Sequence, residues 1–167
     1  MNTDYAYPAS GVTDNQRRTY DHIQLFDAPL PDIPDRLPRM PDSNDTSRPF
    51  QDRARAYLAA NCSMCHQPGG PAPTSMDLHW GIPSSQMNAI NVRPGNGGLG
   101  IDNSFILSTR NPDQSILLYR MSLRDELFQM PPLATSRVDQ DAVNLIRTWI
   151  SRLGKVVPSI GILLLAN

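Results

Sequence analysis

The stretch FQDRARAYLAANCSMCH, residues 50–66, decides the fold of this chain. Its first part, residues 50–61, predicts a helix because these residues share one helical face: Ala54, Tyr57, Leu58 and Asn61. Pro49 precedes the helix, at a place where proline is tolerated. The helix is therefore expected to run directly into residues 62–66, which carry both cysteines of the chain.

Residues 62–66 form a C-x-x-C-H motif, the attachment signature of a c-type haem. A helical turn with two intervening residues brings both thiols to the two vinyl groups on one porphyrin edge, and the next residue points its imidazole at the iron. We therefore expect one covalent haem c, with Cys62 and Cys65 as thioether attachments and His66 as an axial ligand. No cysteine remains for a disulfide framework.

Two other uses of a cysteine pair fit the sequence less well. A structural zinc site needs four ligands, mostly Cys and His, and outside the motif the chain offers only His22 and His79. A thioredoxin-like redox pair is expected near a βαβ pattern, whereas here a helix precedes the motif.

The sixth iron ligand has several candidates in the sequence: Met76, His79, Met87, Met121 and Met130. Methionine commonly fills gaps in a core, so most of these side chains are expected to pack. Met130 is the preferred candidate because it lies in a loop between two expected helices, and Pro131 and Pro132 stiffen that loop. An open or water-bound iron is the remaining alternative.

Two further helices are expected after a long loop. Residues 67–111 are rich in Gly, Pro, Asn and Ser and predict loops, with a weak helical turn at 84–90. Residues 112–123 predict a helix with Asn111 as its N-cap. Residues 137–153 predict the strongest helix, with Ser136 and Asp139 as a capping box and Gly154 as its end. No stretch shows convincing strand alternation.

The two ends of the chain predict extensions. Prolines spaced through residues 1–49 allow no long helix: Pro8, Pro29, Pro31, Pro34, Pro38, Pro41 and Pro49. We expect an extended arm on a surface, with a helical turn near 15–26, or plain disorder. The apolar end of the tail, residues 160–167, is shorter than the roughly 20 residues of a spanning helix. It is expected to pack or to contact a partner.

The first residues, MNTDYAYPAS, lack the charged and apolar regions of a secretory signal. Since c-type haem is attached outside the cytoplasm, we expect a mature form or a piece of a longer chain, located in the periplasm or another extracytoplasmic compartment. A net charge of −1 argues against a nucleic-acid partner. Aromatic residues make up only 7% of the chain, few for a large core, and a haem would add apolar volume to it.

The segments ARAYLAANCSMCHQPGG, NPDQSILLYRM, QMPPL and WI resemble the class I cytochrome c family over residues 50–153. They are also similar to haem segments at the ends of larger bacterial extracytoplasmic proteins. The resemblance implies an all-α, cytochrome c-like fold, with three main helices around one haem, long loops and the extended Pro-rich arm. It implies three regions: an arm (1–49), a cytochrome c domain (50–154) and a tail (155–167).

The same resemblance implies thioethers at Cys62 and Cys65, and axial ligands at His66 and Met130. The first and last helices are then expected to meet, with Tyr57 or Leu58 against one of three residues of the last helix: Ile146, Trp149 or Ile150. The chain departs from small family members in its long polar loop, 67–111, and in its arm, 1–49.

These features predict an electron carrier or relay domain rather than an enzyme, because a six-coordinate iron leaves no place for a substrate. The expected partner is a redox protein, either a dehydrogenase or another cytochrome. Two alternatives stay open: a haem enzyme or gas sensor with an open distal site near His79, and an assembly subunit whose arm and tail bind other chains. The candidates for contact with the haem propionates are Arg93, Arg110, Arg120 and Arg124.

Overall fold

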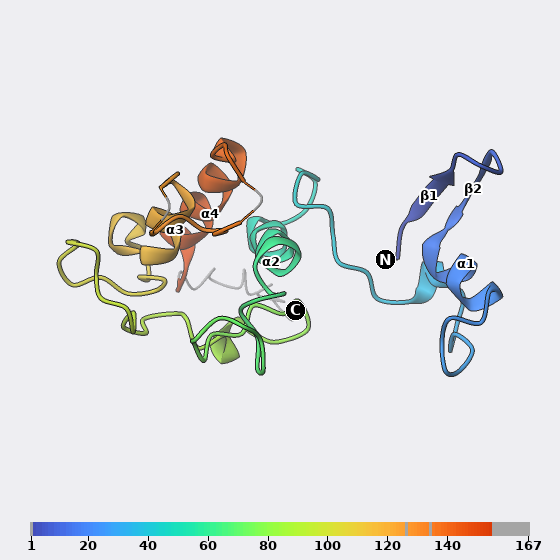
Figure 1. Cartoon of the computed structure of the whole chain (residues 1–167), viewed down its shortest axis with the longest axis horizontal. Helices are drawn as coiled ribbons and strands as arrows, with labels where there is room; N and C mark the ends of the chain where they lie inside the picture. Colours follow the sequence, from blue (N-terminus) through green and yellow to red (C-terminus); the bar gives the residue numbers. More distant parts are fainter. Residues whose placement is uncertain (1, 126, 134, 155–167) are drawn as a thin grey trace, which may run out of the picture. The chain divides into compact units, whose positions relative to one another are not determined.

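The computed structural model describes residues 2–125, 127–133 and 135–154. The chain divides into two compact units, Met1–Asp42 and Ser43–Asn167, each described here by itself (Figure 1). This division falls after Asp42, whereas the boundary expected from the sequence follows residue 49. The expected tail, residues 155–167, lies outside the described residues.

The first unit begins with a β-hairpin. Strands β1 (Asp4–Tyr7) and β2 (Val12–Asn15) pair antiparallel, with Asp4 opposite Asn15 and Tyr7 opposite Val12. The turn between them, residues 8–11, places Gly11 at φ +68°, a left-handed conformation that glycine adopts readily.

Helix α1 (Gln16–His22) follows the hairpin directly. Asn15 caps this helix, because its side-chain oxygen accepts a hydrogen bond from the Arg17 N–H at 3.0 Å. The buried Asn2 amide donates to the carbonyls of Pro34 and Leu37 at 2.9 and 3.0 Å. Residues 34–37 are thereby held beside the hairpin, and Pro34–Arg36 form a short 3₁₀ turn.

The hairpin shows that the expected all-α, cytochrome c-like fold with an extended arm is wrong. Residues 4–15 form a two-stranded sheet, so the chain is a small mixed α/β structure. Each strand has only four residues, too few for a clear alternating pattern. Their tyrosines, valine and threonine favour strands. The strands are nevertheless recognised only from the backbone pairing across the hairpin, which the sequence does not reveal.

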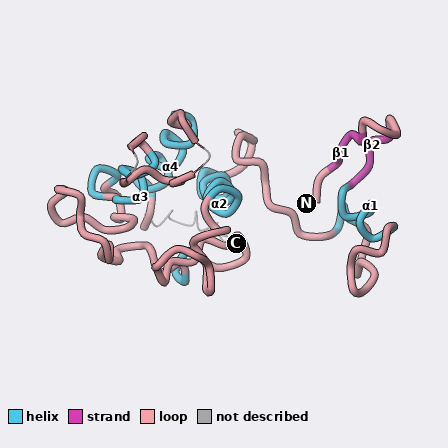
Figure 2. The backbone as a smooth tube through the Cα atoms, viewed as in Figure 1, coloured by secondary structure: helices cyan, strands magenta, loops and turns pink. Residues whose placement is uncertain are grey.

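The described residues of the second unit form three α-helices joined largely by loops: α2 (Phe50–Asn61), α3 (Ile116–Met121) and α4 (Gln140–Arg152) (Figure 2). Helix α2 has the bounds expected from the sequence. The helix expected at 112–123 is divided, because Pro112–Gln114 form a 3₁₀ turn and Ser115 has an extended ψ of 105°. Helix α4 starts at Gln140, where Asp139 accepts a hydrogen bond from the Ala142 N–H at 3.0 Å.

The core of this unit lies between its helices. Helix α2 contacts α4, and α3 also contacts α4. Leu58 belongs to the same buried cluster as Ile146, Trp149 and Ile150, so the expected meeting of the first and last helices of residues 50–153 is confirmed. Among the described residues, no helix is long and apolar enough to cross a membrane.

The loops of this unit are tied together by backbone hydrogen bonds rather than by long strands. The Leu78 N–H donates to the His66 carbonyl at 2.9 Å, and the Asn91 N–H donates to the Leu107 carbonyl at 2.8 Å. Short parallel bridges join Ile90 with Leu107 and Phe105 with Ser115. The long segment 67–111 therefore has a defined course around the helices.

Candidate functional site

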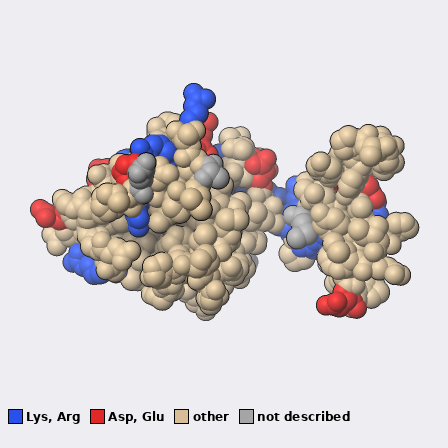
Figure 3. Space-filling view, viewed as in Figure 1, with Lys and Arg blue, Asp and Glu red and all other residues tan. Residues whose placement is uncertain are grey.

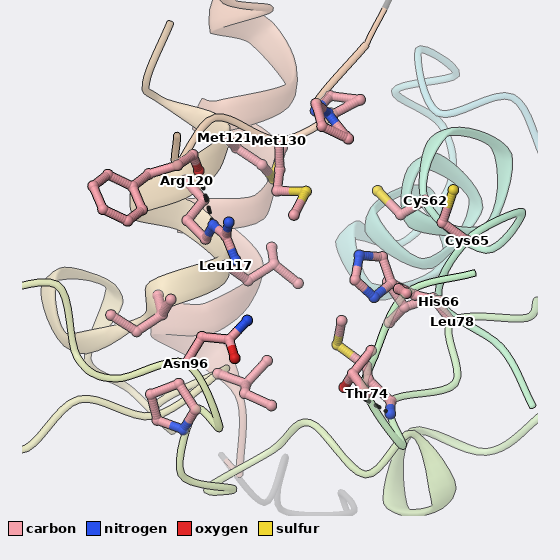
Figure 4. A pocket seen from close by; sticks show the side chains of 18 of the residues that line it. Cys62, Cys65, His66, Thr74, Leu78, Asn96, Leu117, Arg120, Met121 and Met130 are labelled. Atoms are coloured by element: carbon pink, nitrogen blue, oxygen red, sulfur yellow. Dashed lines mark hydrogen bonds between the residues drawn. The ribbon is translucent and has the colours of Figure 1, made fainter. Parts of the chain in front are cut away.

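A cavity of about 670 Å³ opens at the end of α2 and brings the motif of residues 62–66 together with distant parts of the chain. Figure 4 shows Cys62, Cys65 and His66 on one side, with Leu78 and Thr74 nearby. Residues 72–76, residues 92–99, helix α3 and residues 127–133 contribute most of the remaining lining. The cavity thus joins the beginning, middle and end of the second unit.

The wall that carries His66 is built by the turn that follows α2. The Cys62 N–H donates to the Leu58 carbonyl at 2.9 Å, and the Cys62 carbonyl accepts from the N–H groups of Cys65 and His66 at 3.1 and 2.9 Å. These bonds wind residues 62–66 into a compact turn, which places both thiols and the imidazole at the end of α2. The two cysteines are free thiols and form no disulfide with each other.

Gly70 lets the chain return close to this turn. A Cβ atom at residue 70 would overlap the backbone carbonyl of Cys65, so a side chain there would displace the motif. The Ala72 N–H donates to the same carbonyl at 3.3 Å. The glycine therefore belongs to the support of the site, a role the sequence indicated only as a loop.

Burial sets the protonation of two side chains in the motif. It raises the pKa of the Cys62 thiol to about 12, and the neighbouring Cys65 adds to the rise. Burial also lowers the pKa of His66, with a further contribution from the positive charge of Arg120. At neutral pH Cys62 is therefore a thiol and His66 a neutral imidazole with a lone pair available for a metal. A thiol held in this form is a poor nucleophile for disulfide exchange.

Met130 faces the motif from the opposite wall. It stands there with Leu117, Arg120 and Met121, which come from α3 (Figure 4). The Met130 N–H donates to the Arg120 carbonyl at 3.0 Å, which ties the loop to the last turn of α3. The cavity thus contains the four residues expected to hold a haem: Cys62, Cys65, His66 and Met130.

The other candidate sixth ligands occupy different places. Met76 lines the cavity, but its segment is paired with the backbone of His66 through the Leu78 N–H, so it lies on the His66 wall. Met121 lines the opposite wall and is also a buried member of the hydrophobic core.

Met87 is fully buried away from the cavity lining. His79 also lies outside the lining, with 49% of its side chain exposed and its Nδ1 3.1 Å from Asp77 Oδ1. Of the expected ligands, Met130 therefore combines a place across from His66 with a loop position outside the core.

Three of the four arginines considered for propionate contact line the cavity: Arg93, Arg120 and Arg124. Arg110 does not, because its side chain donates to the Gly154 carbonyl at 2.7 Å. Asn96 and Thr74 add polar groups to the lining that the sequence did not single out. Both lie in loops without a motif, so no pattern could have identified them.

The surroundings of the motif carry few charges. Between Arg55 and Arg93 the only Asp, Glu, Lys or Arg is Asp77. Figure 3 shows uncharged side chains over the visible part of the second unit that this segment forms. The wall that carries the motif therefore contributes little charge to the cavity, whose arginines, Arg93, Arg120 and Arg124, come from other segments.

The residues present fit a covalently attached haem. Two thiols, an imidazole and a thioether line one cavity, and its volume is within the usual range of cofactor pockets. The Nδ1 atom of His66 is buried and has no hydrogen-bond partner in the described part of the chain, so this ring nitrogen is not committed to another contact. A zinc site is not supported, since the described residues contain no group of three or more His, Cys, Asp or Glu able to hold a metal ion.

Comparisons of the chain with protein-family models, with curated proteins and with solved structures found no match. The function is therefore inferred from the residues of this cavity.

Proposed function

We propose that the chain binds one haem c through Cys62 and Cys65, with His66 and Met130 as the axial ligands of the iron, and that it transfers electrons. One observation carries this proposal. The fold places a methionine thioether across a cavity from the imidazole of a C-x-x-C-H motif, although the two residues are far apart in sequence. A C-x-x-C-H sequence that had arisen by chance would not be expected to lie across a cavity from a methionine thioether.

The side chains divide the work of binding. Each thiol would form one C–S bond with a vinyl group and pass its hydrogen to the neighbouring vinyl carbon, so attachment would require no oxidant. His66 would supply a neutral nitrogen ligand, and the thioether of Met130 would favour ferrous iron. The bound haem supplies an iron that alternates between the ferrous and ferric states.

A carrier fits these residues better than an enzyme does. With both axial positions filled, no site at the iron is left for a substrate. His79, the polar residue considered for an open distal site, lies outside the cavity lining.

We further propose an extracytoplasmic, periplasmic location, because c-type attachment takes place there, and a redox protein as the partner. The partner would be a dehydrogenase or another cytochrome. The first unit exposes Ile23, Leu25 and Ile33, and it is the part we propose for contact with another subunit. This contact is separate from the haem site and does not affect the argument for it.

The test is a reduced-minus-oxidised visible spectrum of the chain after expression in a host that attaches c-type haem. We expect a sharp low-spin α band, a weak far-red absorption from the iron–thioether bond, and haem that remains bound after denaturation. Met130→Leu should abolish the far-red absorption, whereas Met87→Leu, a buried methionine outside the cavity, should preserve it. A protein that acquires no haem, or a wild-type spectrum that is high-spin and changes with carbon monoxide, would exclude this function.

A further inference from the structure

Two hydrogen bonds fasten residues 128–130, which include Met130, to Arg120 of α3. The Arg120 carbonyl accepts a hydrogen bond from the Met130 N–H at 3.0 Å. The Arg120 Nε–H donates to the Phe128 carbonyl at 2.8 Å. The main chain and the side chain of one residue therefore hold both ends of the segment 128–130.

The apolar residues that precede Gln129 are exposed, whereas Met130 itself is partly buried. Leu127 is 78% exposed and Phe128 is 42% exposed. The N–H groups of both residues bind Asp125 Oδ1, at 3.0 and 2.6 Å, which shapes the preceding turn but does not tie it to a helix. The two bonds to Arg120 are therefore the hydrogen bonds by which residues 128–130 reach α3 in the described part of the chain.

We propose that Arg120 is the positioning residue of the distal ligand, holding the Met130 thioether on the wall that faces His66. This inference rests on the proposed His66/Met130 ligation. The Arg120 side chain acts through the loop backbone and forms no bond to the iron.

Arg120 also brings a positive charge to the site. Its guanidinium lies on the cavity wall beside Leu117 (Figure 4), and no carboxylate of the described residues forms an ion pair with it. A positive charge at this place opposes the additional charge of ferric iron, so it raises the reduction potential. The positioning role and the charge can be separated by substitution.

The variants Arg120→Gln and Arg120→Leu separate the positioning role of Arg120 from the effect of its charge. The Nε2 atom of glutamine stands as many bonds from Cα as the Nε of arginine, so Arg120→Gln can keep the bond to the Phe128 carbonyl without the charge. Arg120→Leu removes both the donor and the charge. Arg110→Gln is the matched control, because Arg110 lies outside the cavity lining.

We expect Arg120→Leu to lose the far-red absorption while the haem stays attached. The amide of residue 130 should exchange with solvent about tenfold faster, which corresponds to the loss of one hydrogen bond. Arg120→Gln should keep the far-red absorption and show a lower reduction potential. Arg110→Gln should resemble the wild type in all three measurements.

An Arg120→Leu protein with an unchanged far-red absorption and unchanged amide exchange at residue 130 would overturn the inference. So would an Arg120→Gln protein that loses the absorption as completely as Arg120→Leu. A wild-type protein without attached haem overturns the proposed function instead, and amide exchange in the haem-free chain then still tests the tether. The two failures are therefore distinguishable.

Discussion

Replacing Arg55 by leucine should destabilise the second unit much more than the same change at Arg53, on the same helix. Arg55 is only 5% exposed. Its guanidinium donates to the carbonyls of His79 and Ile82 at 2.7 and 2.9 Å, and to Ser84 Oγ at 3.1 Å. These bonds hold the segment that follows Leu78 of the cavity wall against α2.

The cost can be worked from these partners. Arg55→Leu leaves two part-buried carbonyl acceptors without their donor, and such a loss lies at the lower end of the roughly 1–3 kcal/mol that an unsatisfied buried acceptor costs. Removing the buried charge offsets part of this loss of stability, because burial of the guanidinium is itself unfavourable. The net loss in the free energy of unfolding should be about 2 kcal/mol. Arg53 donates a single bond, from Nε to the Ser43 carbonyl at 2.8 Å, so Arg53→Leu should cost less than about 1 kcal/mol.

Urea unfolding followed by circular dichroism measures both variants against the wild type. The expected result is a clearly lower midpoint for Arg55→Leu with an unchanged slope, and a small shift for Arg53→Leu. Equal shifts for the two variants would refute the reasoning, because they would show that the three hydrogen bonds of Arg55 contribute no more than the one bond of Arg53.

Three further predictions concern the support of the cavity. Gly70→Ala should push against the Cys65 carbonyl and lower the free energy of unfolding by about 1–3 kcal/mol. Gly81→Ala, with open space around it, should be nearly neutral. Thermal unfolding of both variants tests this difference. Ile146→Ala should cost about 3 kcal/mol, because this fully buried side chain lies in the core cluster, and a cost below about 1 kcal/mol in urea unfolding would contradict that packing. Burial, with a contribution from Asp139, raises the pKa of Tyr57 to about 12, above the value near 10 of an exposed tyrosine. The folded chain therefore keeps the phenol proton more tightly than the unfolded chain does. The free energy of unfolding should be constant below about pH 10 and fall toward pH 12. Tyr57→Phe should show a smaller fall in the free energy of unfolding when it is measured across that range.

The helices of the second unit were predictable because their signals are local. Pro49 and the shared face of residues 50–61 located α2 at both ends. The apolar periodicity of α4 located it to within three residues, and its start depends on one cap, Asp139, whose carboxylate binds the Ala142 N–H. The helix expected at 112–123 was less accurate, because the extended Ser115 interrupts it, and Ser115 takes this shape in a bridge to Phe105.

The hairpin and the support of the cavity were not predictable from local patterns. The pairing of β1 with β2 involves strands too short to show alternation. The two hydrogen bonds between Arg120 and residues 128–130 use backbone carbonyls as acceptors. Every residue has such a carbonyl, so the sequence does not indicate these bonds. The motif at 62–66 could be found because its chemistry requires particular residues at fixed spacing, whereas Asn96 and Thr74 reach the cavity only through the course of the loops.

The residues proposed to bind the haem are spaced unevenly along the chain, and this spacing affects the order in which attachment and folding take place. Both thiols and the imidazole lie within residues 62–66, and the turn that gathers them closes through contacts only a few residues apart, which form quickly. The Met130 wall depends on contacts between α2, α3 and α4, which are distant in sequence and form later. In the proposed holoprotein, covalent attachment can therefore precede tertiary closure, and the thioether reaches the iron only in a chain that has finished folding.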